Sequence, residues 1–229
     1  MNAEADPSAS PLLESGAPKG DALLAGILLH GRDRTREDKV VLAGSFGVDG
    51  VRWLAPAADT GSWYPGRFFE PRAANEPFLT RAVAQCDRVV DEAAEGGRLG
   101  PERLVMVGFS QGACLTIEYA LQRPGRCGTL IVLTGALIGP PETVWPSSPG
   151  LLAGTRVLLT GSDADDWISE EQTRHTARVL RNLGADVRLR IYRGRPHIVC
   201  EDELREAREL LQALHDCVPG RNRDSALSR

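Results

Sequence analysis

The sequence predicts an α/β fold in which helices cover both faces of a mostly parallel central sheet. Short apolar runs of strand length alternate with longer segments whose apolar residues recur at helical spacing. The runs are almost uninterrupted, which is typical of strands buried on both sides. Because no repeat or linker breaks the alternation, we expect one domain over residues 21–217. The ends, residues 1–20 and 218–229, have little to bury and are expected to be disordered tails.

The first half of the domain supplies two strands, two helices and a long loop. The apolar run from Leu23 to Leu29 stops at a His-Gly pair, which indicates a buried strand that meets a loop. Thr35 precedes acidic residues, as a helix cap does. Residues 51–55 are the second strand, and residues 57–76 are a loop rich in Pro, Gly and aromatic side chains. Residues 77–95 have apolar side chains at helical spacing.

The second half of the domain alternates between strands and helices. The predicted strands here are residues 104–107, 130–133, 156–160 and 187–192. The predicted helices are residues 111–122, 169–183 and 201–215. Such alternation is expected of a parallel sheet whose crossover connections are helices.

The composition excludes several classes of protein. The net charge is −4, and no basic stripe is present that could neutralise the phosphates of a nucleic acid. No apolar run approaches the roughly 18 residues of a membrane span, and the chain does not start like a signal peptide. The five cysteines are widely spaced, with no CxxC and no zinc-like Cys/His cluster. We therefore expect a cytoplasmic protein with no membrane span and no nucleic-acid partner.

One short motif has the features of a catalytic turn. Gly108-Phe109-Ser110-Gln111-Gly112 is the only G-x-S-x-G match, and it lies between a predicted strand and a predicted helix. Such a turn holds the serine in a strained conformation, and its glycines remove side chains that would clash. A serine that only caps the helix is the alternative interpretation. The strand and helix on either side favour Ser110 as a nucleophile.

A serine nucleophile needs a histidine that accepts its proton. His197 lies between the last strand and the last helix, where an α/β hydrolase places this base. The other histidines are in less suitable places: His30 precedes the serine, His175 lies within a helix and His215 lies near a helix end. The sequence therefore predicts that His197 is the general base.

The acid that orients the histidine should lie between the serine and the histidine in the chain. The strand over residues 156–160 runs into a turn that contains Asp163, Asp165 and Asp166. One of these carboxylates should accept a hydrogen bond from Nδ1 of His197. Spacing alone does not choose among the three.

These motifs resemble the phospholipase/carboxylesterase family of α/β hydrolases, which includes the acyl-protein thioesterases. The resemblance extends over residues 24–211 and rests on Leu29-His30-Gly31-Arg32, on residues 108–114, on residues 161–169 and on Tyr192-Arg193-Gly194 with Pro196-His197. Three further blocks resemble one bacterial branch of the family, which includes hydrolases linked to quinone and hydroquinone resistance. These blocks are Ala55-Pro56-Ala57, Trp63-Tyr64-Pro65 and Asn75-Glu76-Pro77. The resemblance implies an α/β-hydrolase fold, and because the family includes dimers it leaves a homodimer open.

The resemblance also implies roles for particular residues. It places the catalytic acid at Asp165, although the two prolines that usually follow this acid in the family are absent here. It implies an oxyanion hole made by the backbone N–H groups of Arg32 and Gln111. The family often has small residues after the His-Gly pair, whereas this chain has Arg32-Asp33-Arg34, which predicts a narrower site or a polar substrate.

The sequence therefore predicts a serine carboxylesterase or thioesterase that acts on a small acyl or aryl ester through an acyl-enzyme. This mechanism needs neither a metal nor an organic cofactor, and nucleotide binding is not supported because no P-loop or G-x-G-x-x-G motif is present. The predicted substrate-binding residues are Trp63, Tyr64, Phe68, Trp167 and Ile168. Acyl transfer, cyclisation or C–C bond hydrolysis by the same three residues is one alternative, and a non-catalytic ligand-binding protein is another.

Overall fold

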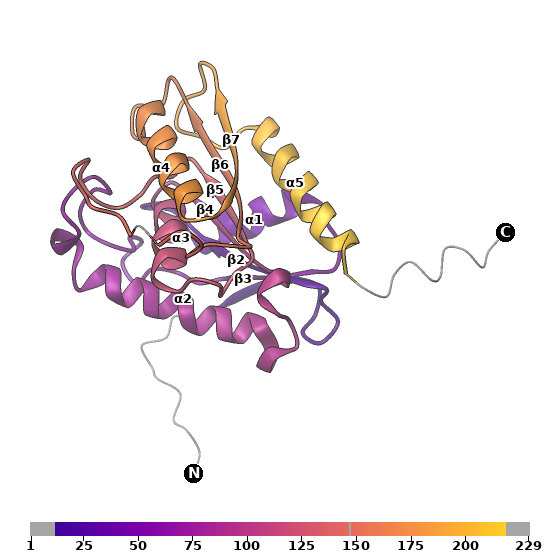
Figure 1. Ribbon diagram of the computed structural model, residues 1–229. Coiled ribbons are helices and arrows are strands. Elements are labelled where there is room, and N and C mark those ends of the chain that lie inside the picture. The colour runs from indigo at the N-terminus through magenta and orange to yellow at the C-terminus, as the bar shows by residue number, and fades with distance from the viewer. Residues whose placement is uncertain (1–11, 147, 219–229) are drawn as a thin grey trace, which may run out of the picture.

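A seven-stranded sheet forms the centre of the computed structural model, which describes residues 12–146 and 148–218 (Figure 1). Its strands are β1 (Leu13–Gly16), β2 (Leu24–Leu29), β3 (Val51–Ala55), β4 (Leu104–Phe109), β5 (Thr129–Leu133), β6 (Arg156–Ser162) and β7 (Asp186–Tyr192). Their order across the sheet is β1-β3-β2-β4-β5-β6-β7. The β1–β3 pair is antiparallel and every other neighbouring pair is parallel, so the predicted mostly parallel α/β fold is confirmed.

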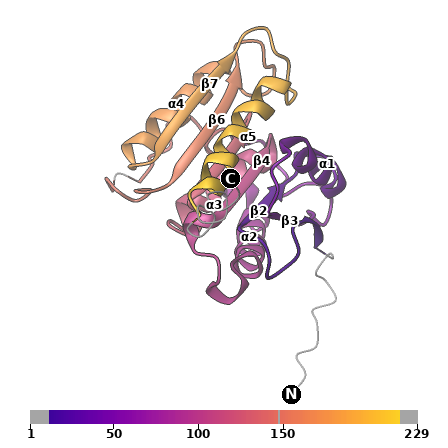
Figure 2. The ribbon, with the colours of Figure 1, turned by 90° about the vertical axis from the view of Figure 1, so that its right-hand side faces the viewer.

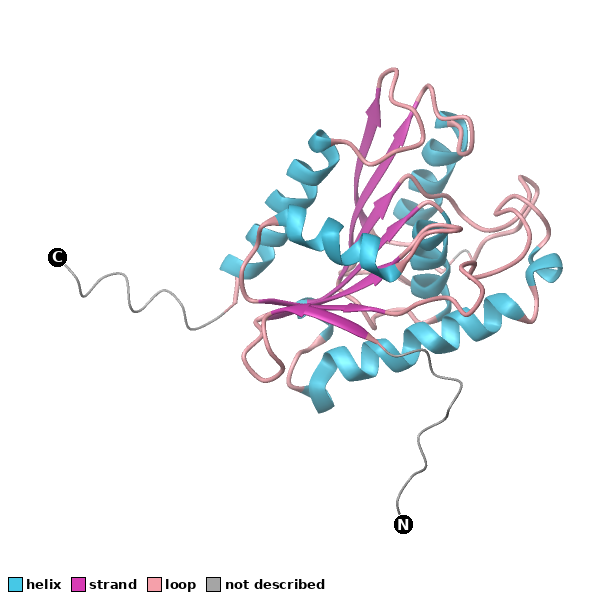
Figure 3. Ribbon diagram, turned by 180° about the vertical axis from the view of Figure 1, so that it is seen from behind, coloured by secondary structure: helices cyan, strands magenta, loops and turns pink. Residues whose placement is uncertain are grey.

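Helices cover both faces of the sheet. They are α1 (Arg36–Phe46), α2 (Phe78–Ala94), α3 (Gln111–Gln122), α4 (Glu170–Asn182) and α5 (Glu201–Asp216), with short 3₁₀ turns at Arg72–Asn75, Glu95–Gly97 and Pro101–Arg103. Figure 2 shows α1 and α5 in front of the sheet, and Figures 1 and 3 show α2, α3 and α4 on the opposite face. Each face has its own buried apolar cluster. Within the described ranges, no helix is both long and apolar enough to cross a bilayer.

Local capping explains where two of the helices begin. The Thr35 side chain accepts a hydrogen bond from the Asp38 amide, and the Asp38 carboxylate accepts one from the Thr35 amide. Ser169 and Gln172 make the same reciprocal pair at the start of α4. Each pair satisfies two backbone donors that the first helical turn leaves unpaired. The helix start predicted at Thr35 is therefore confirmed.

The prediction that residues 1–20 are a disordered tail is wrong for the strand β1. Leu13–Gly16 pairs with β3, and Glu14 accepts a hydrogen bond of 2.9 Å from Nε of the buried Arg52. The strand forms because β3 offers it an unpaired edge and Arg52 offers its carboxylate a partner. The prediction is wrong for residues 17–20 as well, since the Ala17 amide donates to the Val51 carbonyl and the Gly20 amide to the Glu95 carboxylate. Residues 1–11 and 219–229 of the two predicted tails lie outside the described residues.

Candidate active site

A single residue, Ser110, joins β4 to α3 at the carboxyl end of the sheet. Its φ of 54° and ψ of −119° lie in a strained region for any residue with a side chain. A Cβ on Gly108 would lie 2.3 Å from the carbonyl oxygen of Gly112, and a Cβ on Gly112 would lie 2.3 Å from that of Leu29. Glycine is therefore required on both sides of the turn, so that α3 can approach β2 and β4 closely.

We expect Gly112→Ala to lower the free energy of unfolding by about 1–3 kcal/mol or more, because the new methyl group would meet backbone that cannot move aside. Gly44→Ala is the matched control. Gly44 lies inside α1 with open space around it, so alanine there should raise the free energy of unfolding by about 0.5–1 kcal/mol. Urea unfolding of both variants measures the difference. Equal stability of the two variants would contradict the close approach.

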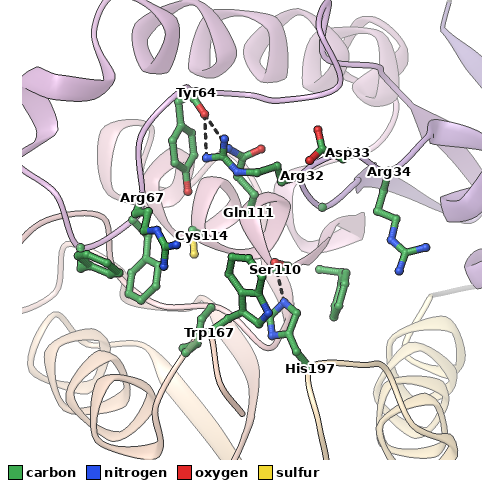
Figure 4. A pocket seen from close by; sticks show the side chains of 15 residues that line it. Arg32, Asp33, Arg34, Tyr64, Arg67, Ser110, Gln111, Cys114, Trp167 and His197 are labelled. Carbon is green, nitrogen blue, oxygen red and sulfur yellow. Dashed lines mark hydrogen bonds between the residues drawn. The ribbon is translucent and has the colours of Figure 1, made fainter.

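A chain of hydrogen bonds connects the three residues that the sequence proposes as a triad. The Ser110 hydroxyl lies 2.8 Å from Nε2 of His197 (Figure 4). Nδ1 of His197 lies 2.8 Å from Oδ2 of Asp165 and 3.0 Å from Oδ1. An ionised carboxylate only accepts hydrogen bonds, so Nδ1 carries the proton and Nε2 is free to accept one from the serine.

The geometry distinguishes the three aspartates that follow β6. The Asp165 side chain is completely buried, and its Oδ1 accepts hydrogen bonds of 2.8 and 2.9 Å from the amides of Trp167 and Ile168. Burial by itself raises its pKa, but the hydrogen bonds from His197 and from these two amides outweigh burial and hold the pKa below its ordinary value of 3.8. Asp163 instead accepts from the Gly194 amide, 2.7 Å away. The carboxylate beside the histidine is therefore Asp165.

A buried ion pair holds the loop that carries His197. The guanidinium of Arg195 donates to the carbonyl oxygens of Pro196 and Ile198, which lie on either side of the histidine. The same group lies 3.7 Å from the fully buried carboxylate of Glu203. Sequence reasoning missed this pair, since an acidic residue in the first turn of a helix is expected there for other reasons.

The two residues predicted to form an oxyanion hole use their side chains elsewhere. The Arg32 guanidinium donates to the carbonyls of Tyr64, Pro65 and Gly66. The Gln111 amide group donates to the Tyr64 carbonyl, 2.8 Å away, and Figure 4 shows both side chains directed at this residue. Among the described residues, neither backbone N–H has an acceptor, and both residues line the cavity at Ser110.

Trp63 was predicted to bind substrate, but it lies behind the cavity and does not line it. Only 3% of its surface is exposed, its indole N–H donates to the His30 carbonyl, and its ring stacks on the His30 imidazole. His30 in turn accepts a hydrogen bond from the Ala58 amide. Burial lowers the pKa of His30, so this histidine stays neutral and has a structural role. The aromatic character of Trp63 did not reveal which way its ring faces.

A cavity of about 350 Å³ opens at Ser110. It is lined by the other four predicted substrate-binding residues, Tyr64, Phe68, Trp167 and Ile168, and also by Arg67, Phe69, Phe109 and Cys114. The Arg67 guanidinium lies over the rings of Phe69 and Trp167, at 5.8 and 5.4 Å from their centroids, and so joins two loops across the cavity. Sequence reasoning did not single out Arg67. Its position among aromatic residues in the predicted loop 57–76 was the signal that could have identified it as a residue of the site.

Cys114 is a second potential nucleophile in this cavity. Burial raises the pKa of its thiol to about 11, and its sulfur accepts a hydrogen bond from the Ala136 amide. Because the thiolate is the reactive form of cysteine, this side chain is inert near neutral pH. No group of three His, Cys, Asp or Glu side chains suited to a metal ion occurs within residues 12–146 and 148–218.

The mostly parallel sheet, the helices on both faces and the sharp strand-to-helix turn at Ser110 define the α/β-hydrolase fold. Within this fold, the chain belongs to the phospholipase/carboxylesterase family, whose model matches residues 54–215. The resemblance proposed from the sequence motifs is thus confirmed at the level of the family. The narrower likeness to a hydroquinone-resistance branch stays a prediction.

Individual relatives agree with this assignment. Acyl-protein thioesterase 1 from Gibberella zeae is 28% identical over 115 residues, which are 49% of this chain and 48% of that protein. The corresponding protein from Mycosarcoma maydis is 28% identical over 127 residues, 52% of this chain and 50% of that protein. The alignments therefore span about half the length of these curated relatives.

Solved structures match almost the whole chain. The phospholipase/carboxylesterase from Dyadobacter fermentans superposes with a TM-score of 0.81 and 31% identity, over 89% of this chain and 97% of that one. Esterase PE8 superposes with a TM-score of 0.74 and 25% identity, over 90% of this chain and 98% of that one. The fold is therefore shared with a phospholipase/carboxylesterase and with an esterase over 89% and 90% of this chain.

Proposed function

We propose that the protein is a serine carboxylesterase or thioesterase that hydrolyses a small acyl or aryl ester through an acyl-enzyme. The observation that carries this proposal is the unbroken hydrogen-bond chain from Ser110 through His197 to Asp165, at the wall of a cavity. The names of the relatives, an acyl-protein thioesterase and an esterase, support the same class of reaction.

The proposed mechanism follows from the positions of these groups. The Ser110 oxygen attacks the carbonyl carbon while Nε2 of His197 accepts its proton. The negative oxygen that results is stabilised by the unpaired amides of Arg32 and Gln111. The alcohol or thiol leaves with the proton from His197. Water then attacks the acyl-enzyme with the roles of base and acid repeated, which releases the carboxylic acid and restores the serine.

The cavity supports a small acyl or aryl group. Aromatic residues form much of its lining, and Cys114 with its neutral thiol adds a further uncharged surface. The Arg32 guanidinium is engaged by loop carbonyls, so it does not offer a free charge to the acyl group. The volume of about 350 Å³ suits a short acyl chain or one ring.

Initial rates on a panel of p-nitrophenyl acyl esters and acyl thioesters test the proposal, with Ser110→Ala as the blank. We expect turnover in the wild type that falls to the blank in the variant, and a rate that declines as the acyl chain outgrows the cavity. If a well-folded wild type is no faster than Ser110→Ala on every substrate, the hydrolase proposal is wrong. Transfer, cyclisation or C–C cleavage would be recognised by products other than the free acid.

A further inference from the structure

A second cavity, of about 310 Å³, lies between α1 and the loop that carries His197. It shares Arg34, Phe109 and His197 with the first cavity, so the two meet at the catalytic histidine. Lys39 of α1 and Leu204 of α5 line its other walls. Arg67 lines only the first of these two cavities whereas Arg34 lines both, and in Figure 4 these two arginines lie on opposite sides of Ser110.

Lys39 is an unusual group to find in such a place. The chain has only two lysines, and Lys19 is exposed and pairs with Glu92 at 2.7 Å. Lys39, in contrast, has only 5% of its surface exposed, and its ammonium lies 4.9 Å from the centroid of the Phe109 ring. Its ammonium has no hydrogen-bond or ion-pair partner among the described residues. The ammonium nitrogen is not among the fully buried polar atoms of the described residues that lack a hydrogen bond, so it reaches the open space of the cavity, where an anion carried by a ligand can pair with it.

We propose that this second cavity binds the leaving group of the substrate and that Lys39, with Arg34, binds a carboxylate carried by that alcohol or thiol. The inference rests on the proposed esterase function and specifies its substrate class. His197 must protonate the leaving atom, so the leaving group has to lie on the histidine side of Ser110. The second cavity opens on that side.

The charges that line the cavity suit a single negative charge. Arg34 and Lys39 contribute two positive charges and Asp38 one negative charge, and the Asp38 carboxylate is already engaged by the Thr35 amide. One net positive charge fits a monoanionic carboxylate better than a phosphate dianion, which Asp38 would repel.

The same groups determine how binding should depend on pH. Burial lowers the pKa of Lys39 to about 8, Asp38 acts to raise it and Arg34 acts to lower it. The remaining titratable groups nearby are His197 at the cavity wall and His30, whose own pKa Lys39 helps to lower. The ammonium is therefore charged at neutral pH and loses its charge as the pH rises through about 8, which weakens the binding of an anion.

A matched pair of aryl acetates tests the proposal. meta-Carboxyphenyl acetate and its methyl ester have the same acyl group, and their leaving groups differ by one negative charge and one methyl group. We expect Lys39→Met to lower the ratio of kcat/KM for the carboxylate over that for the methyl ester by about 10- to 100-fold. Lys19→Met, the matched control at the other lysine, should keep the wild-type ratio. In the wild type alone, the ratio should also fall as the pH rises through about 8.

A binding measurement keeps this proposal separate from the esterase proposal. Titration calorimetry of meta-hydroxybenzoate, the carboxylate leaving group itself, needs no turnover. We expect Lys39→Met to weaken its binding to the protein at least about tenfold, with a melting temperature no lower than that of wild type as the check on folding. An unchanged substrate ratio, or equal binding of meta-hydroxybenzoate by wild type and Lys39→Met, would overturn the carboxylate site. Absence of Ser110-dependent turnover together with lysine-dependent binding would overturn only the esterase proposal.

Discussion

Replacement of Asp165 by asparagine is expected to lower kcat for ester hydrolysis by about 10⁴-fold with little change in structure. The amides of Trp167 and Ile168 both donate to Oδ1, so the oxygen of the new side chain stays there. Its NH₂ group then takes the place of Oδ2 and faces Nδ1 of His197, 2.8 Å away. An NH₂ group donates, so Nδ1 must accept and Nε2 must carry the proton. A protonated Nε2 cannot take the proton of Ser110.

Asp163→Asn is the matched control for this experiment. Its new side chain keeps an oxygen that can accept from the Gly194 amide, and Asp163 does not touch His197. We expect kcat for this variant to stay within about threefold of wild type. Steady-state rates on one p-nitrophenyl ester suffice for both variants. Comparable losses in the two variants would show that Asp165 has no special role.

The lowered pKa of Asp165 also predicts how the stability of Asp165→Asn, relative to wild type, depends on pH. A carboxyl with a lower pKa in the folded than in the unfolded protein stabilises the fold above its ordinary pKa of 3.8, and this contribution is lost as the pH falls through the folded pKa. Wild type should therefore be more stable than Asp165→Asn at neutral pH, and the difference should shrink below about pH 4. Thermal unfolding at several pH values measures it, and a difference that grows in acid would contradict the assignment.

Arg195→Met is expected to lower the free energy of unfolding by about 3–5 kcal/mol, because it leaves the buried Glu203 carboxylate without its cation. The carbonyls of Pro196 and Ile198 would also lose the guanidinium as a donor, and Pro196 would keep only its hydrogen bond of 2.7 Å from the Ile198 amide. Since these carbonyls flank His197, we further expect kcat to fall about 10- to 100-fold through misplacement of the base. Urea unfolding and steady-state rates give the two quantities.

Two further variants isolate the ion pair. Arg193→Met removes a neighbouring arginine whose side chain is 94% exposed and should change stability by no more than about 0.5 kcal/mol. Arg195→Met combined with Glu203→Leu removes both charges and should recover much of the lost stability, but not the lost kcat. A double variant less stable than Arg195→Met would mean that the charge of Glu203 is not what makes the single substitution costly.

Much of the fold could be predicted because its signals are local. Most of the parallel strands are runs of apolar residues, β7 alternates charged and apolar residues, and Ser110 and the two glycines of its turn occur together in five residues. β1 could not be predicted in this way. It has only four residues, its burial alternates, and it depends on a partner strand and on Arg52, both far away in the sequence.

The candidate site shows the same limit. The order of Ser110, an aspartate and His197 along the chain predicted which residues meet. The residues alone could not choose between Asp165 and Asp163, because the choice depends on which loop each carboxylate contacts. Lys39 gave no sequence signal, because a lysine next to acidic residues in a first helical turn is normally exposed. Its burial follows from the packing of α1 against Phe109, a tertiary contact.

The separate tasks of backbone and side chain at Arg32 and Gln111 have a consequence for how this site can diverge during evolution. Every amino acid except proline has a backbone N–H, so the two donors facing the cavity survive almost any substitution at these positions. The side chains, in contrast, fix the carbonyls of residues 64–66. Mutations here would first displace the cavity wall that this loop forms. Substitutions at Arg32 and Gln111 can therefore change which substrates fit the cavity, while the two backbone donors at the reacting carbonyl stay in place.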